Sequence, residues 1–210
     1  MAEVEIFKLF LLVMIRVGGL VVSAPVLGSG NFPIMGKIGL TAATALLITP
    51  TLPALAAGLP AEPMAFGVLA IGELMIGLMM GFVMTLVFAA VQVAGQIMDL
   101  QTGFGMMNVF NPAMETQYPI FGFFLFILGV LFLLVTGGHR MMLWALYSTY
   151  EHIPVGGFTV HPELWVEAGR WGQWLFIDGL MLAAPVTAAM LLAYVVLGLL
   201  GRVVPQIQLF

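Results

Sequence analysis

The chain has 210 residues, of which 62% are hydrophobic and 8% are charged, and its formal net charge is -4. With a mean hydropathy of +1.13 it has too little polar surface to cover a water-soluble domain, so the composition predicts an integral membrane protein. Six basic and ten acidic side chains are too few for a nucleic-acid-binding surface, and the absence of cysteine excludes disulfides and thiolate chemistry.

Apolar runs separated by glycine and proline predict five long helices, or six if one of them breaks. In chain order they cover residues 6–26, 38–55, 64–93, 120–150 and 171–203. The longest runs exceed the roughly 20 residues that cross hydrocarbon, so they tilt, kink or extend into protein. Pro185 predicts a kink in the last run. We therefore expect an all-α fold of helical membrane hairpins, forming one domain over residues 1–210.

Charged residues within these runs are informative, because a charge at the centre of a membrane helix costs about 2.5 to 3.5 kcal/mol on the insertion scale. Arg16, Glu73 and Asp178 lie within predicted helices, and Asp99 follows one of them. One interpretation is that each lies near a helix end and snorkels or pairs with a neighbour. The other is that these charges face partner subunits or a wet interior, which the shortage of internal partners favours for at least one. We predict all four to be buried or assembly charges.

Small residues mark one side of the third predicted helix. Gly77 and Gly81 form a G-x-x-x-G step, and further small residues follow along the same helix. This pattern predicts close helix approach, either within the chain or with another chain.

The segment over residues 94–119 interrupts the apolar runs without being polar. It holds three glycines, two prolines and only two charges, Asp99 and Glu115. A continuous helix through it is not expected, and a solvated linker would be more polar. Irregular backbone survives in a bilayer only where protein or a water-filled cavity satisfies its amides, so this loop is predicted to line or block an internal passage.

Methionine and phenylalanine side chains of this loop suggest how the passage closes. Methionine is flexible enough to fill a constriction and deform around cargo, and apolar constrictions block ions by dewetting. Lipid-facing or core packing is the alternative for these side chains. The predicted plug residues are Phe104, Met106, Met107, Phe110 and Met114.

Candidate catalytic groups do not assemble into a site in the sequence. His139, His152 and His161 lie in or beside the joints, and none has a metal-ligand partner at helical spacing. The glycine steps lack the other residues of a phosphate-binding loop. We therefore predict no catalytic, metal or cofactor site, and no enzyme activity.

Motif residues are spread over almost the whole chain, and their order and spacing are more specific than any single one. They are residues 16–19, 37–40, 89–92 and 205–210 with Ala24, Pro25, Gly28, Gly72, Glu73, Gly77, Gly81, Phe82, Gly95, Asp99, Gln101, Gly103, Asn111, Pro112, Gly138, His139, Ser148, Pro154, Pro185 and Arg202. Together they resemble the FliR family of flagellar type III export-gate proteins and their virulence-system counterparts. Asn111 and Gln208 depart from that pattern, where the family often has Asp and Asn.

The resemblance implies a subunit of a protein-export gate in the bacterial inner membrane, at the flagellar basal body and reaching above the bilayer plane. One such subunit would join FliP-like and FliQ-like subunits, with an FlhB-like protein on the closed gate. A loop of the subunit would plug the channel for exported unfolded polypeptides. Family members continue with a further apolar segment, so the sequence is expected to be incomplete at its C-terminus.

Three alternatives remain at the level of sequence. A multi-pass transporter for ions or small molecules would use Glu73, Asp99 and Asp178 as a coupling-ion site near discontinuous helices. A static membrane scaffold would have no moving part. An intramembrane enzyme is the weakest alternative, because it needs a catalytic pair on facing helices.

Overall fold

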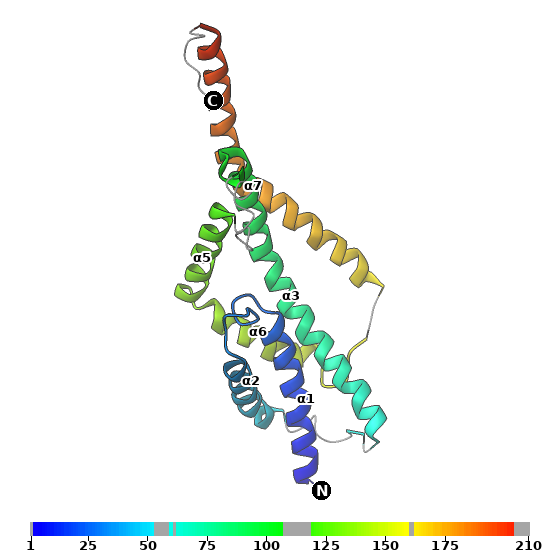
Figure 1. Cartoon of the computed structure of the whole chain (residues 1–210). Helices are drawn as coiled ribbons and strands as arrows, with labels where there is room; N and C mark the ends of the chain where they lie inside the picture. Colours follow the sequence, from blue (N-terminus) through cyan, green and yellow to red (C-terminus); the bar gives the residue numbers. More distant parts are fainter. Residues whose placement is uncertain (1, 53–58, 61, 107–118, 160–161, 204–210) are drawn as a thin grey trace. The chain divides into compact units, whose positions relative to one another are not determined.

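The computed structural model describes residues 2–52, 59–60, 62–106, 119–159 and 162–203 (Figure 1). Within these ranges the regular structure is entirely helical. The helices are α1 (Ala2–Ser23), α2 (Ile34–Ile48), α3 (Pro63–Thr102), α5 (Ile120–Val135), α6 (Gly138–His152) and α7 (Glu163–Val203), with short 3-10 turns at Thr49–Thr51 and Phe104–Met106. The expected all-α fold is confirmed.

Among the described residues, four helical stretches are long and apolar enough to cross a membrane, namely Glu3–Ser23, Ile34–Thr51, Pro63–Thr102 and Glu163–Val203. The pair α5 and α6 passes the same test together but is bent by 68°. The predicted single helix over residues 120–150 is therefore two helices. The break falls at Gly137, whose φ of +72° lies in the left-handed region that glycine adopts without steric cost.

The central segment begins later than its composition predicted. α3 continues as a helix to Thr102, so residues 94–102 are not part of an irregular loop. The reason is packing, because Ala94 and Met98 are buried against Ala183, and this outweighs the weak helix preference of Gly95. α7 is helical on both sides of Pro185, and the kink predicted there stays a prediction.

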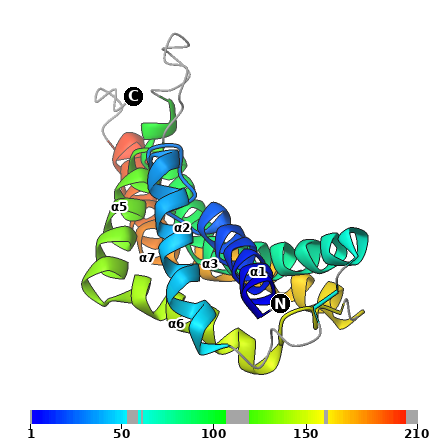
Figure 2. The same cartoon turned by 90° about the horizontal axis from the view of Figure 1, so that it is seen from below.

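Packing groups the chain into two compact units. The single domain expected over residues 1–210 stays a prediction. The first comprises Met1–Leu86 and Phe132–Gly169. α1 lies beside α2 in both views (Figures 1 and 2). The buried side chains of α1 recur every three or four residues, as expected for one face of a helix. This core consists of Leu9, Val13, Val17, Leu20 and Val21 of α1, Ala45 and Ile48 of α2, and Leu146 and Tyr150 of α6.

The second unit comprises Val87–Leu131 and Arg170–Phe210. Its core joins the end of α3 to α5 and α7, with Ala94, Met98 and Ala183 buried. Small residues bring the backbones together, because a Cβ on Gly179 would lie 3.0 Å from the Ala90 carbonyl oxygen. This unit therefore positions both described ends of the central segment.

Candidate functional site

A fully buried ion pair joins α1 to α3 in the first unit. Nε of Arg16 lies 2.5 Å from Oε2 of Glu73, and both side chains are 0% exposed. An isolated charge in such a place would cost several kcal/mol, so each partner depends on the other to be tolerated there. The two sequence-predicted charges are thus partners inside the chain, which the sequence left open.

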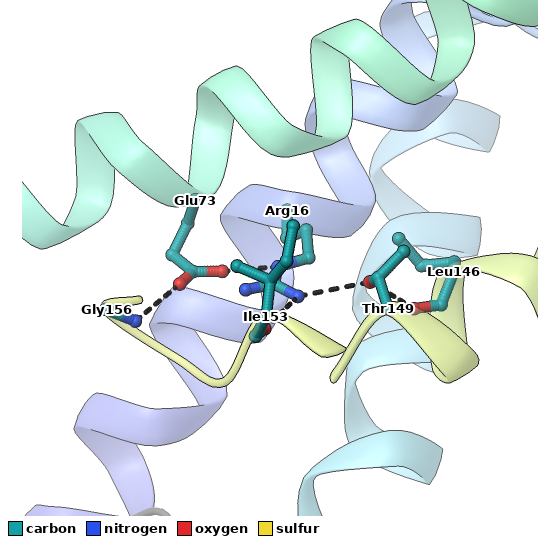
Figure 3. A network of polar contacts seen from close by, with 6 residues as sticks. All are labelled: Arg16, Glu73, Leu146, Thr149, Ile153 and Gly156. Atoms are coloured by element: carbon teal, nitrogen blue, oxygen red, sulfur yellow. Dashed lines mark hydrogen bonds and ion pairs between the residues drawn. The ribbon is translucent and has the colours of Figure 1, made fainter. Parts of the chain in front are cut away.

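Two further polar atoms of the pair, Arg16 Nη1 and Glu73 Oε1, contact α6 and the segment that follows it (Figure 3). Nη1 of Arg16 donates to Thr149 Oγ1 and to the carbonyl oxygen of Ile153, both at 3.1 Å. Oε1 of Glu73 accepts from the backbone N–H of Gly156 at 2.9 Å. The pair therefore ties four segments together: α1, α3, α6 and the chain after α6.

Tyr150 completes the surroundings of the Arg16 guanidinium. The guanidinium carbon lies 4.0 Å from the centre of the Tyr150 ring, a distance typical of cation–π attraction. Within the described residues, Arg16 Nη2 and the Tyr150 hydroxyl have no hydrogen-bond partner. The guanidinium thus has an aromatic contact in addition to its hydrogen bonds.

Glycines on α3 make the approach of α1 possible. Gly77 and Gly81 follow Glu73 at intervals of four residues, so all three face α1. A Cβ on Gly77 would overlap the Arg16 carbonyl oxygen, and one on Gly81 would overlap Ser23 Oγ. The G-x-x-x-G step therefore serves packing within the chain, the first of the two predicted interpretations.

Asp99 is buried in the second unit, where it binds backbone amides. It is 3% exposed, and its carboxylate accepts from Phe121 N at 3.1 and 3.2 Å and from Gly122 N at 3.4 Å. Asp178 differs from the other three predicted charges because it is exposed on α7. Among the described residues it has no hydrogen bond or ion pair.

The predicted plug residues fall mainly outside the part of the chain that the structure describes. Phe104 lies in the 3-10 turn after α3, is 42% exposed, and its ring centre lies 5.8 Å from that of Phe121. Met106 ends the same turn. Met107, Phe110 and Met114 lie outside the described residues, so their predicted role stays a prediction.

Sequence reasoning missed the partners of the buried pair. Each of these partners lies more than 70 residues in sequence from the charged residue that it contacts. They are Thr149, Tyr150, the Ile153 carbonyl and the Gly156 N–H. The only available signal was the Gly156-Gly157 joint.

The described residues contain no group of three His, Asp or Glu side chains placed to hold a metal ion, and His161 lies outside them.

Comparison with known proteins decides the family. Residues 7–210 match the family described as Bacterial export proteins, family 1. The chain is 32% identical to the flagellar biosynthetic protein FliR of Escherichia coli (strain K12), over 94% of this chain and 75% of that relative. The chain belongs to the FliR family. Against FliR of Bacillus subtilis (strain 168) the identity is 30%, over 99% of this chain and 80% of that relative. The family predicted from the motif residues is confirmed.

Removing one partner of the buried pair in this FliR-family chain should be strongly destabilising. We expect Arg16→Met or Glu73→Gln to lower the free energy of unfolding by about 3 to 5 kcal/mol, because each leaves a buried charge unpaired. The double variant Arg16→Met with Glu73→Leu should lose less than either single variant. Unfolding in micelles measures these changes, with the exposed Glu151→Gln as control. Single-variant losses below about 1 kcal/mol would contradict the assigned pairing.

Two glycines of α3 provide a matched test of the close contact with α1. Gly77→Ala should lower the free energy of unfolding by about 1 to 3 kcal/mol, because the new methyl group displaces α1. Gly67→Ala on the same helix meets no atom within 4 Å, so it should be neutral or stabilising by up to about 1 kcal/mol. Equal effects of the two substitutions on unfolding would contradict this packing.

Proposed function

We propose that this chain is an export-gate subunit of a flagellar-type, type III protein secretion apparatus. Its match to the bacterial export family over residues 7–210 carries the proposal. In this role the chain assembles with FliP-like and FliQ-like subunits and an FlhB-like protein, and contributes to the channel for unfolded polypeptides. It performs no covalent chemistry. We place the gate in the bacterial inner membrane, at the flagellar basal body.

Helix length supports an assembly that extends beyond the bilayer. α3 has 40 residues and α7 has 41, which at 1.5 Å per residue gives each a length of about 60 Å. The hydrocarbon core is about 30 Å thick, and a tilt of about 40° would use only about 40 Å of such a helix. The remaining length needs other protein or water around it.

The exposed side of α7 supports coverage by a partner subunit. Only 6% of its most apolar stretch is buried inside the chain. Lipid would cover the apolar side chains, but it offers nothing to the exposed carboxylate of Asp178. Since an unpaired charge among lipid tails is costly, we propose that a partner subunit covers Asp178 and supplies a cation or hydrogen-bond donor.

The central segment is the proposed plug of the channel. Phe104 follows directly after α3, half-exposed at the base of the segment, and the apolar character of residues 104–114 suits a seal that excludes water. Phe104, Met106, Met107, Phe110 and Met114 would close the resting channel and move aside for substrate.

The transporter alternative receives little support from the described contacts. Glu73 is occupied by Arg16 and by a backbone N–H, and Asp99 is occupied by two backbone N–H groups. Neither carboxylate is left open for a coupling ion. Purification distinguishes the two functions, because a transporter should be stable alone whereas a gate subunit should require its hetero-partners.

Polar substitution of the plug should make the resting gate leak. Replacing Met106, Met107 and Phe110 by serine removes the apolar seal, so we expect ion conductance of the reconstituted complex to rise at least tenfold. Subunit composition, followed by native mass measurement, should stay unchanged. The matched control replaces Met64, Met75 and Met141, which are exposed on α3 and α6 and lie outside residues 94–119. Wild-type conductance of the plug variant would contradict the plug assignment.

Charge reversal at Asp178 should prevent assembly. Asp178→Lys places a cation opposite the proposed donor, so the amount of co-purified FliP-like and FliQ-like subunits should fall at least tenfold. Asp178→Glu keeps the charge and should retain most of the complex. Unfolding of the isolated chain should be unaffected in both variants, because the side chain is exposed. Normal co-purification of Asp178→Lys would contradict the proposed contact.

A further inference from the structure

The N-cap residue of α5 has no side chain that can cap the helix. The backbone N–H of Phe123 donates to the Pro119 carbonyl oxygen at 2.8 Å, which places Pro119 at the N-cap position. Proline has no side-chain oxygen to accept from the next amides. The N–H groups at the start of a helix have no partner within the helix, and leaving them unsatisfied in an apolar setting is costly.

Asp99 of α3 supplies the missing cap from outside the helix. Its carboxylate accepts from Phe121 N and Gly122 N, the second and third positions of α5. These are the amides that an N-cap side chain normally reaches from within its own helix. A negative charge at this end also interacts favourably with the helix dipole. The capping group here comes from more than 20 residues away in the sequence.

Two further contacts join the same two helix ends. A Cβ on Gly95 would overlap the Gly122 backbone, so α3 and α5 touch through two glycines. Beyond the end of α3 the chain turns at Gly103, whose φ is +81°, and Phe104 then places its ring against that of Phe121. Asp99 lies between these contacts in sequence, four residues from each glycine.

We propose that Asp99 is a positioning residue that fixes the start of α5 to the end of α3. By capping α5 it fixes the position of the first turn of α5 relative to the last turns of α3. These two helix ends are the base of the central segment, because the segment joins them. This role lies inside the chain, not at a subunit interface. It deepens the proposed function, since the position of the plug rests on this base, but the capping contact itself can be tested without reference to export.

Amide hydrogen exchange in the assembled complex measures directly whether the first amides of α5 are capped. Asp99→Ala should speed exchange of the Phe121 and Gly122 amides at least tenfold, because among the described residues the carboxylate is the acceptor for both. Asp99→Asn retains one acceptor oxygen and should give an intermediate rate, which keeps the test valid if the alanine variant fails to fold. The control Glu151→Gln removes an exposed carboxylate of α6 and should leave both rates unchanged. Unchanged protection in Asp99→Asn and Asp99→Ala would overturn the proposal.

Spin labels provide a second measurement of the helix ends. The chain has no cysteine, so labels can be attached at Leu100→Cys and Phe124→Cys alone, both exposed positions on α3 and α5. The distribution of distances between the labels should be narrow with Asp99 present and at least twice as broad with Asp99→Asn. An equally narrow distribution in both would overturn the proposal.

Conductance separates this proposal from the plug assignment. If Asp99→Asn loses amide protection and the channel leaks, the base position and the plug are both supported. If protection is lost while conductance stays at the wild-type level, the capping role stands and the plug assignment fails. If conductance rises while protection is unchanged, the positioning role of Asp99 is overturned and the plug assignment remains.

Discussion

The buried pair of Arg16 and Glu73 is the constraint on which the first unit depends. Neither charge tolerates burial alone, so α1 and α3 must lie close enough for a 2.5 Å contact. That closeness requires glycine at positions 77 and 81, where any side chain would meet the backbone or Ser23 of α1. Two features that look independent in the sequence, an isolated charge and a small-residue step, are therefore one structural requirement.

A buried ion pair rarely adds net stability compared with a well-packed apolar pair, so its value lies in what it specifies. Beyond their own contact, Arg16 Nη1 binds Thr149 and the Ile153 carbonyl, and Glu73 Oε1 binds the Gly156 N–H. Apolar side chains in their place would pack in several positions of one helix along the other. The charges instead define how α6 and the chain after it lie against α1 and α3, because any displacement would leave a buried donor or acceptor unsatisfied.

The sequence was sufficient to predict structure that depends on a local pattern of residues. It was insufficient to predict structure that depends on contacts between residues far apart in the chain. Apolar runs predicted the helices, and the cost of a charge in a membrane singled out Arg16, Glu73, Asp99 and Asp178. The end of α3 was misplaced because Gly95 resembles a helix breaker, yet its lack of a side chain is what lets α5 approach. For the predicted helices the sequence left open whether one of them breaks, and the break at Gly137 is that alternative. Thr149 and Ile153, the further partners of Arg16, lie more than 100 residues away, beyond any pattern in a single sequence.

The predicted charges separate into two kinds once their contacts are known. Arg16, Glu73 and Asp99 are satisfied within the chain, by each other or by backbone amides, and so they fix helices against one another. Asp178 has no such partner among the described residues, although its helix is equally apolar. For a member of this export family, the partner subunit proposed above, which would complete the contact, is the simplest physical account.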